Sequence, residues 1–384
     1  MRALTAPAPS TAIYTAEVIV PVCRIDWREF LDRPPLPSPS PEILEAYRRQ
    51  SILITGAGGS IGSSLALRLA RLPLSSLILL DSSESHLLRL QESLSGQQEG
   101  NSESVQFVLA DAGHTVALKH IFETHQPSIV FHAAAYKHVP LLERQPFAAI
   151  VNNVFVAETV ATIAAEHRAR VVLLSTDKAV QPSSILGATK NVAEKIARRS
   201  QGTVLRLANV LASSGSVAER FRAQIARGDP LTVTHAAARR YFLTTDESVD
   251  LLLITAQIGR GGVFAPNLPT DYSIAELAKF MIRILVPGAE LSIEFSGLRP
   301  GDKLTEQLWE DFESTSRAGS GLLSISSDRP GHAGFEHGLA ELRTAVRERD
   351  LQAALAQLCA LVPGYCLSQT VQALAASPVR PVHA

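Results

Sequence analysis

The chain has 384 residues, of which 46% are hydrophobic and 19% are charged, and its formal net charge is −1. This length and composition are typical of a soluble globular protein with two lobes that share a large core. A nearly neutral chain has no overall field that would attract nucleic acid or an anionic membrane surface, so we expect neither as a partner.

Cysteine usage and hydropathy bear on the cellular compartment. The three cysteines, Cys23, Cys359 and Cys366, are odd in number and fit neither a disulfide framework nor the spacing of a metal site. We recognise no secretory signal peptide and no apolar run near the ~20 residues that a membrane-spanning helix needs. We therefore expect a cytoplasmic protein that binds no metal and is not stably inserted in a membrane.

The chain begins with an irregular region and then becomes regular. Residues 1–50 contain the Pro/Ser-rich stretch "RPPLPSPSP" and a short predicted helix, "EILEAYRRQ", and we expect an extension that packs on the main domain or leads into it. From residue 51 onward, short β-branched apolar runs alternate with stretches of helical period. The predicted strands are "SILITG", "SLILLD", "VQFVLAD", "SIVFHAA", "RVVLLSTD" and "GTVLRLANVL". Such alternation predicts a parallel sheet covered by helices on both faces.

These patterns predict an α/β fold, a doubly wound parallel-sheet Rossmann domain with a smaller interleaved α/β substrate lobe. We assign residues 51–211 to the Rossmann domain, with segments that return near 240–275. The less regular residues 212–330 are assigned to the substrate lobe, and 331–384 to a C-terminal helical segment. A long helix is predicted through "FAAIVNNVFVAETVATIAAEH", just before the fifth strand.

A glycine-rich turn follows the first predicted strand. In "GAGGSIGSSLALRLA", Gly56, Gly59 and Gly62 lie between a strand and a helix that begins near Ser60 and Ile61. Such glycines permit a tight turn, a close approach of the backbone to a pyrophosphate and close packing of the helix on the strand. The anion is then bound by the N–H groups at the helix N-terminus. The placement after the first strand therefore predicts a dinucleotide site.

Two carboxylates at strand ends would complete this site. Asp81 ends the second strand, where it can accept hydrogen bonds from an adenosine ribose and would repel a 2′-phosphate, so we expect NAD rather than NADP. Alternatively, Asp81 caps the next helix. Asp111 ends the third strand and can contact the adenine edge or cap the helix that follows.

Several motifs occur in an order and spacing that resemble a known family. They include "TGAGGSIG", "FHAAAYKHVPLLE", "STDKAVQPSSILGATK", "LANVLASSGSV" and "GLRPGDKLTEQL". Together they resemble the extended short-chain dehydrogenase/reductases of polysaccharide biosynthesis, specifically the CapD-like UDP-N-acetylglucosamine 4,6-dehydratase group. The resemblance covers about residues 28–370. It implies bound NAD, a UDP-sugar substrate and a homo-oligomer.

The resemblance implies roles for Thr176, Asp177 and Lys178, which follow the fifth strand at the edge where open parallel sheets bind ligands. Asp177 would be the acid toward the C6 oxygen and Lys178 the base that removes the C5 proton. Burial would lower the pKa of Lys178, whereas pairing with Asp177 would raise it. The alternative is a surface turn in which "TD" caps a short helix.

Leu186 departs from the family pattern. Most short-chain dehydrogenases have a tyrosine four residues before a lysine that matches Lys190, and this lysine holds the nicotinamide ribose. Longer members of the group often carry methionine there, and leucine is similar to methionine in volume and polarity. We interpret Leu186 as a variant of that subtype, in which Thr176, Asp177 or Lys178 manages the C4 hydroxyl. The alternative for Leu186 is that the protein has lost catalytic activity. The alternative for Lys190 is a solvent-exposed lysine on the helix surface.

The resemblance also implies contacts to the rest of the cofactor and substrate. Ala133 lies where the chain passes close to the nicotinamide half of the cofactor, and Asn153 matches a residue that supports the active-site backbone. Lys137 and His138 would lie near the sugar or phosphate, although a lone histidine is more often structural.

Three further residues match positions that hold the nucleotide. Asn209 would meet the diphosphate, and the "SSGS" that follows it offers N–H groups to an anion. Arg240 and Arg299 would hold the UDP end, because guanidinium binds phosphate in a bidentate manner. Arg239 is an alternative to Arg240, and any of these arginines could be a surface charge.

The resemblance therefore implies an NAD-dependent UDP-N-acetylglucosamine 4,6-dehydratase that inverts C5. A nucleotide-sugar 4-epimerase is the alternative among enzymes, although the Thr-Asp-Lys triplet argues for elimination. From another class, a catalytically inactive NAD-binding regulator would explain Leu186.

Overall fold

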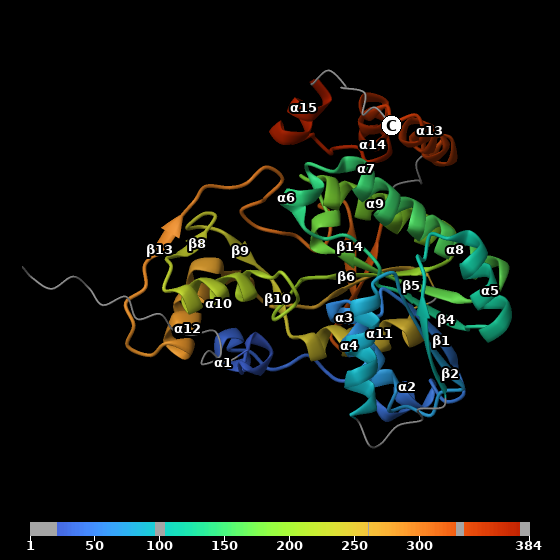
Figure 1. The fold of residues 1–384 in the computed structure, drawn as a ribbon, viewed down its shortest axis with the longest axis horizontal. Coiled ribbons are helices and arrows are strands. Elements are labelled where there is room, and N and C mark those ends of the chain that lie inside the picture. The colour runs from blue at the N-terminus through green and yellow to red at the C-terminus, as the bar shows by residue number, and fades with distance from the viewer. Residues whose placement is uncertain (1–20, 97–103, 260, 328–333, 377–384) are drawn as a thin grey trace, which may run out of the picture.

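The computed structural model describes residues 21–96, 104–259, 261–327 and 334–376 (Figure 1). The first 20 residues of the predicted extension and the last eight of the predicted C-terminal segment lie outside the described residues. The described part has a large lobe around a nine-stranded sheet and a small lobe beside it, on the left in Figure 1.

The large sheet confirms the predicted Rossmann architecture. Its order is β14-β15-β11-β6-β5-β4-β1-β2-β3, and all strands from β11 to β3 are parallel. The hairpin of β14 and β15 adds to one edge in antiparallel fashion. The bounds are β1 Ser51–Thr55, β2 Ser76–Asp81, β3 Val105–Leu109, β4 Ile129–His132, β5 Arg170–Thr176, β6 Thr203–Leu207, β11 Gly262–Pro266, β14 Ser314–Gly319 and β15 Leu322–Ser326.

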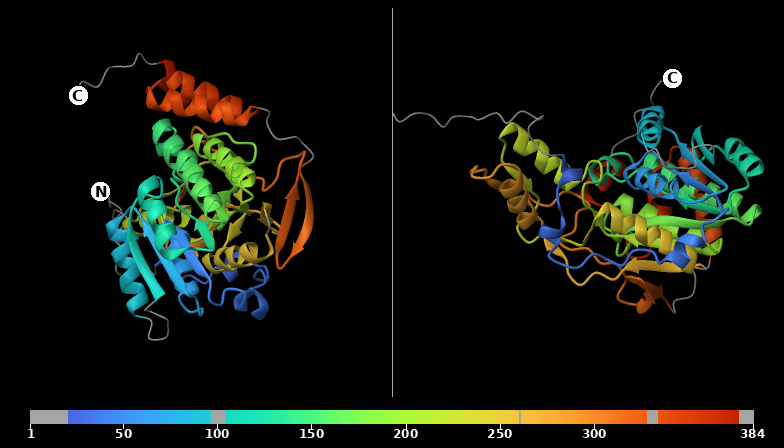
Figure 2. Two further views of the ribbon diagram at one scale, coloured as in Figure 1. Left: turned by 90° about the vertical axis from the view of Figure 1, so that its right-hand side faces the viewer. Right: turned by 90° about the horizontal axis from the view of Figure 1, so that it is seen from below.

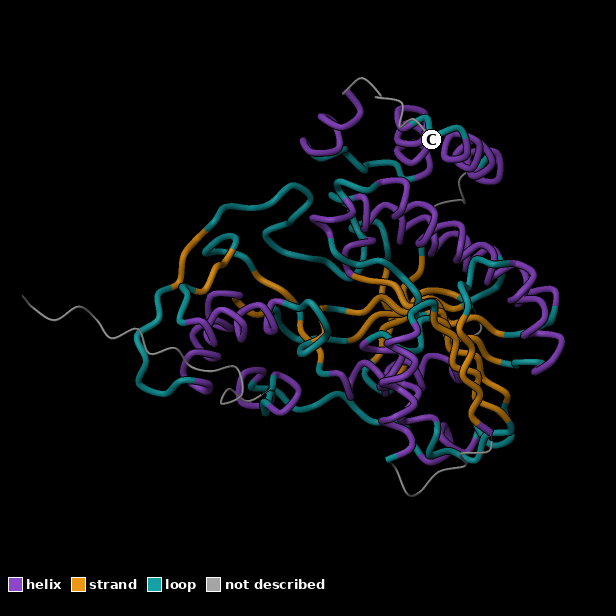
Figure 3. Tube along the Cα trace, viewed as in Figure 1, coloured by secondary structure: helices purple, strands orange, loops and turns teal. Residues whose placement is uncertain are grey.

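Helices cover both faces of this sheet, as Figure 3 shows with the strands between purple helices. Successive residues of a strand point to opposite faces, so Ile52 and Ile54 join one core cluster and Leu53 joins another. The first face is covered by α2 (Pro41–Glu45), α3 (Ser60–Leu69), α4 (Glu84–Ser95) and α11 (Thr245–Ile258). The second is covered by α5 (Thr115–His125), α8 (Val156–Glu166) and α9 (Ile185–Arg199).

The C-terminal helices form a further layer. They pack on α6 (Val139–Leu142), α7 (Pro146–Ile150) and α9, and in Figure 2 (left) they lie outside the green helices that cover the sheet. Lys195 on α9 donates a hydrogen bond to the Leu361 carbonyl, and Ser368 donates one to the buried Glu143. The three helices are α13 Phe335–Arg347, α14 Leu351–Leu361 and α15 Gln369–Ala376.

The small lobe has its own core, to which Phe221, Leu277 and Met281 belong. Short strand pairs connect its parts, namely β8 with β13, β9 with β12, and β10 with β7. Its elements are η1 Val22–Arg24, α1 Arg28–Leu31, β7 Asn209–Val210, α10 Val217–Arg227, β8 Leu231–Val233, β9 Arg239–Arg240, β10 Phe242–Leu243, β12 Tyr272–Ser273, α12 Ile274–Leu285 and β13 Ile293–Phe295. Residues 212–330 were expected to form the substrate lobe, but β14 and β15 join the large sheet because apolar residues such as Leu322 and Ile325 pack in its core.

The N-terminal extension contacts both lobes (Figure 2, right). Phe30 packs against Tyr272 and Phe280 of the small lobe, at ring-centroid distances of 5.4 and 5.3 Å. Arg33 then forms a buried ion pair with Glu247 at the start of α11, with 2.6 Å between Nη1 and Oε1. The predicted helix here is shorter than expected, since α2 ends at Glu45.

The long helix before β5 differs from the prediction in two ways. It is continuous from Pro146 to Glu166 but contains a π-helical stretch, η3 (Val151–Phe155). In the described part of the chain it is also the one helix long and apolar enough to cross a membrane, contrary to our expectation that no apolar run approaches that length. Because 56% of its apolar window is buried inside the α/β fold, this is weak evidence for a membrane span.

Candidate functional site

The glycine-rich turn connects β1 to α3 as predicted. Gly56 has a φ of +70°, and a Cβ there would lie 2.6 Å from the Ala134 nitrogen. A Cβ on Gly62 would lie 2.1 Å from the Gly56 carbonyl oxygen, so helix and strand pack as closely as the motif requires. Gly59 is the N-cap of α3 without a side-chain cap, and a Cβ there would meet only the Gly56 oxygen, at 3.3 Å. The helix start at Ser60 therefore fits an anion.

The carboxylate of Asp81 joins the end of β2 to this turn. Its Oδ2 accepts a hydrogen bond from the Gly58 N–H at 2.9 Å, and its Oδ1 accepts one from the Ser83 N–H at 2.9 Å. Ser83 is the N-cap of α4, so Asp81 supports that helix start without being its cap. Each carboxylate oxygen keeps a lone pair that can accept from a ribose hydroxyl.

Asp111 lies in the turn after β3, where its Oδ1 accepts a hydrogen bond from the Gly113 N–H at 2.8 Å. The N-cap of α5 is His114, whose ring nitrogen accepts from the Ala117 N–H. The alternative that Asp111 caps this helix is therefore wrong.

Polar contacts fix the backbone between β4 and α9. Ala133 donates its N–H to the Thr55 carbonyl, which keeps the chain beside the glycine turn. The Asn153 side chain accepts from the Tyr136 N–H at 2.9 Å and donates to the Tyr136 carbonyl and to Thr189. Lys190 donates to the Leu174 carbonyl and is 5% exposed, so it is not a solvated lysine. Burial lowers the pKa of Lys190 to about 8.

Thr176, Asp177 and Lys178 stand where β5 passes into the 3₁₀ turn η4 (Asp177–Ala179). The Thr176 hydroxyl caps this turn and donates to Asp177 Oδ1 at 2.9 Å. Lys178 Nζ donates to the same oxygen at 2.9 Å. Asp177 is fully buried, and its Oδ2 accepts no hydrogen bond. The triplet thus contains a buried acid beside a partly exposed amine and is not a surface turn.

The surroundings of Lys178 favour its charged form. Its Nζ also donates to Asn209 Oδ1 at 3.0 Å and lies 3.6 Å from Glu306 Oε1. Burial opposes the charge, but the carboxylates of Asp177 and Glu306 outweigh it and raise the pKa of Lys178 above its ordinary value. Of the two effects expected from the sequence, pairing prevails.

Glu306 belongs to this cluster and was not predicted. It is 5% exposed, and ion pairs connect it to Lys178, Lys303 and Arg240. Burial would raise the pKa of Glu306, but these three cations lower it. The available signal was a second acid in "RPGDKLTEQL", three residues after Lys303.

The two arginines of β9 have different environments. Arg240 donates to the carbonyls of Lys303 and Leu304, and its Nε lies 3.8 Å from Glu306. Arg239 forms an ion pair with Asp271 at 2.8 Å instead. Since Arg240 is the one that reaches the Lys178 cluster, the geometry favours Arg240 over Arg239.

Arg299 is more exposed than Arg240 and forms an ion pair with Asp302, with 2.8 Å between Nε and Oδ2. Arg220 on α10, which was not predicted, lies near it. Its Nε is buried without a hydrogen-bond partner, and both burial and the like charge of Arg299 lower its pKa. Unlike Arg299, Arg220 forms no ion pair within the described residues, and a guanidinium group without a carboxylate partner suits a bound anion.

The loop after β7 does not offer the N–H groups that were expected from "SSGS". The Ser214 N–H donates to Ser60 Oγ at 2.9 Å, and the Gly215 N–H donates to Glu219 Oε2 at 2.6 Å. Lys137 and His138 are exposed, and the His138 ring lies against Gly215, where a Cβ would meet it at 2.3 Å. These contacts hold the loop against the glycine turn and α6.

Leu186 faces a core cluster rather than the site's polar groups. It is 4% exposed and packs with Val139, Leu142 and Ile150. Leucine therefore fills this position with apolar contacts and cannot itself transfer a proton.

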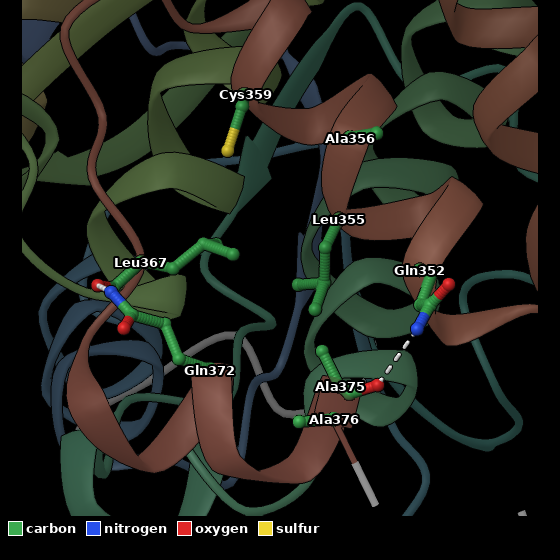
Figure 4. Close-up of a pocket in the computed structure, with 8 residues that line it drawn as sticks. All are labelled: Gln352, Leu355, Ala356, Cys359, Leu367, Gln372, Ala375 and Ala376. Atoms are coloured by element: carbon green, nitrogen blue, oxygen red, sulfur yellow. Dashed lines mark hydrogen bonds between the residues drawn. The ribbon is translucent and has the colours of Figure 1, made fainter. Parts of the chain in front are cut away.

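A hollow of about 400 Å³ lies elsewhere, between α14 and α15 (Figure 4). Leu355, Ala356 and Leu367 contribute to its lining, and the only hydrogen bond drawn joins Gln352 to the Ala375 carbonyl. It contains none of the predicted site residues, and its apolar lining is unsuited to a phosphorylated ligand.

Comparison with known sequences agrees with the motifs. A family model described as "Polysaccharide biosynthesis protein" matches residues 52–324. The chain is 37% identical over 295 residues to the capsular polysaccharide biosynthesis protein CapD of Staphylococcus aureus, a match that covers 74% of the chain and 49% of CapD. It thus spans about half the length of this relative. It is 35% identical over 275 residues to a UDP-glucose 4-epimerase of Rickettsia prowazekii, covering 67% of the chain and 77% of that protein.

Solved structures share the fold. Pen from Bacillus thuringiensis superposes with a TM-score of 0.68 at 27% identity, over 73% of this chain and 90% of that one. The dTDP-glucose 4,6-dehydratase DesIV of Streptomyces venezuelae, with NAD and TYD bound, gives a TM-score of 0.59 at 21% identity, over 67% and 88% of the two chains.

Proposed function

The chain belongs to the polysaccharide biosynthesis protein family of extended short-chain dehydrogenase/reductases. We propose that it is an NAD-dependent nucleotide-sugar 4,6-dehydratase. We propose UDP-N-acetylglucosamine as its substrate and inversion at C5 as its outcome. The observation that carries the proposal is the hydrogen bond of 2.9 Å between Lys178 and the buried Asp177. Elimination of water needs a base and an acid close together, and this pair contains both.

The residues of the glycine turn fit the proposed cofactor. Gly56, Gly59 and Gly62, with the helix start at Ser60 and Ile61, would hold the pyrophosphate of NAD. Asp81 would accept from the adenosine ribose and Asp111 would face the adenine, while Ala133 and Lys190 would contact the nicotinamide half. When bound, NAD supplies an acceptor for the C4 hydride, which is later returned to C6. The Asp81 carboxylate disfavours the 2′-phosphate of NADP.

The proton balance of the reaction follows from the ion pair. The raised pKa of Lys178 makes the ammonium its resting form, which cannot act as a base. Movement of one proton from Lys178 Nζ to Asp177 produces a neutral amine and a carboxylic acid. The amine can then remove the C5 proton, and the acid can protonate the departing C6 hydroxyl. The elimination itself therefore needs no proton from solvent. The proton released from the C4 hydroxyl when the hydride leaves is balanced by the proton that C5 takes up when the hydride returns to C6. The latter would come from the Lys178 ammonium, whose N–H groups exchange with solvent.

The substrate would lie between polar side chains of the large lobe and of the small lobe. Arg240, Arg299 and Arg220 offer guanidinium groups for the diphosphate, and Asn209 connects that end to Lys178. Lys137 and His138 would approach the sugar from the loop after β4.

A nucleotide-sugar 4-epimerase is the second candidate, because a relative of 35% identity is named UDP-glucose 4-epimerase. Epimerisation needs hydride transfer at C4 but no acid for a leaving hydroxyl. The buried Asp177 beside Lys178 therefore favours elimination.

The test is incubation of the purified protein with NAD and UDP-N-acetylglucosamine in deuterated water, followed by mass and NMR spectra of the product. We expect loss of one water and deuterium at C5. A product of unchanged mass with inverted C4 would support the epimerase instead, and unchanged substrates across a panel of UDP-sugars would contradict both.

Three variants separate the roles. Asp177→Asn and Lys178→Ala should each lower turnover by about 100- to 10,000-fold, since each removes a proton-transferring group. Lys279→Ala, which breaks only an exposed ion pair on α12, should leave it unchanged. Turnover that survives both site substitutions would contradict the assignment.

A further inference from the structure

Glu306 lies in an irregular stretch that returns from the small lobe to the large sheet. Between β13 and β14 the chain forms no helix or strand, and most of its side chains there are at least partly exposed. Glu306 is nevertheless turned inward and is 5% exposed. Placing a carboxylate out of water is costly unless its partners compensate, so its surroundings require an explanation.

The partners of Glu306 are the cations of the candidate site. Its Oε1 lies 3.6 Å from Lys178 Nζ and 3.8 Å from Arg240 Nε, and its Oε2 lies 3.2 Å from Lys303 Nζ. Oε2 accepts no hydrogen bond. Lys178 in turn faces the charged groups of Asp177, Glu306 and Arg240.

A second buried ion network in the same region shows a different geometry. Arg206 is bound by Glu194 and Glu313 through hydrogen bonds of 2.7 to 3.1 Å. Such bidentate contacts suit a structural clamp, which holds the 299–313 stretch to β6. The longer contacts of Glu306 hold three cations by charge and leave an oxygen without a hydrogen bond.

We propose that Glu306 is a positioning residue of this site, which holds the Lys178 amine between two carboxylates and links it to Arg240 at the substrate end. The role of Lys178 in elimination rests on the proposed function, whereas the action of Glu306 on Lys178 does not. Glu306 opposes the movement of the Lys178 proton to Asp177, so the amine stays protonated and in place until the substrate changes the surrounding charges. Glu306 itself transfers no proton in the proposed reaction and acts through the Lys178 amine that it holds.

The test measures the titration of Lys178 without relying on turnover. The full chain, with NAD added, is labelled by acetic anhydride across a pH series, and the modification of each lysine is quantified by peptide mass spectrometry. Lys178 is accessible, since its side chain is 23% exposed. In Glu306→Gln the pKa of Lys178 should fall by about one unit, which raises its labelling near neutral pH about tenfold.

Two controls distinguish charge from structure. Glu313→Gln removes a buried carboxylate of the same stretch that does not contact Lys178, so the Lys178 titration should not change. Lys279, in its exposed pair with Glu276, should titrate identically in every variant. If Glu306→Gln does not fold, Glu306→Asp, which keeps the charge but withdraws it by one methylene, should shift Lys178 in the same direction by less.

The outcomes are separable from those of the proposed function. Coincident Lys178 titrations in the wild type and the Glu306 variant would overturn the role of Glu306, even if the protein dehydrates UDP-sugars. An equal shift in Glu313→Gln would also overturn it, because the effect would then be structural. Absence of turnover would remove the proposed function while leaving this titration readable.

Discussion

At the scale of single residues, burial and pairing have opposite effects on two lysines of the site. Lys178 has two carboxylates within 4 Å and keeps its charge. Lys190 is buried beside a backbone carbonyl, and burial lowers its pKa to about 8. The pKa of the same side chain is therefore raised at one position and lowered at the other.

The pKa of Lys190 leads to a prediction about stability. Between pH 8 and 10.5 the unfolded chain binds a proton at this lysine that the folded chain has lost, so the free energy of unfolding should rise with pH in that window. For one buried group the rise is about 3 kcal/mol. Urea unfolding across the pH series measures it.

Because two lysines are shifted in this way, the wild type should show about twice that rise, and Lys190→Met, which keeps the volume but cannot be charged, should remove about half of it. The other half should remain because burial also lowers the pKa of Lys195 to about 8. Equal pH dependence in the wild type and Lys190→Met would show that Lys190 is not charged differently in the two states.

At the scale of an element, two glycines of the turn between β1 and α3 have different roles, one in packing and one in binding the proposed cofactor. Gly62 is needed for packing, because a Cβ there would lie 2.1 Å from the Gly56 oxygen. Gly59 has no such conflict and instead stands at the helix start, where the pyrophosphate of the proposed cofactor would lie.

We therefore predict different defects for two alanine substitutions. Gly62→Ala should lower the free energy of unfolding by about 1–3 kcal/mol through overpacking. Gly59→Ala should lower the free energy of unfolding by less than Gly62→Ala does, at most about 1 kcal/mol through the poorer N-cap, and should weaken NAD binding. Thermal unfolding and calorimetric titration with NAD measure the two effects, and equal stability losses would contradict this division.

At the scale of the whole molecule, the N-terminal extension holds the two lobes together. Its aromatic residues pack in the small lobe, and the Arg33–Glu247 ion pair, buried on both sides, fixes it to α11 of the large lobe. Glu247 also completes a capping box with Thr244 and accepts from the Leu36 N–H. Breaking a buried pair leaves an uncompensated charge.

Arg33→Met should accordingly lower the free energy of unfolding by about 3–5 kcal/mol. The matched control is Arg283→Ala, which breaks the exposed pair between Arg283 and Glu29 of the same extension and should cost less than about 1 kcal/mol. Urea unfolding of both variants measures the difference. Equal losses would show that the buried pair is not what joins the lobes.

Local sequence patterns by themselves determined the parallel sheet, the glycine turn and part of the candidate site. The alternation of strands and helices predicted the parallel sheet, because periodicity reports which face of an element is buried. The glycine spacing predicted the turn at Gly56, and adjacency alone placed Asp177 next to Lys178. The family motifs placed Arg240 near the substrate end but did not exclude Arg239.

Only the tertiary structure decided which distant groups reach the site. Glu306 approaches Lys178 from a stretch far along the chain, and Leu186 turns into the core instead of toward the polar cluster. The orientation of Arg240 toward Glu306, and of Arg239 toward Asp271, depends on the pairing of β9 with β12. Periodicity and motifs are properties of neighbouring residues, whereas electrostatic contacts between remote segments depend on how the lobes pack and exclude water.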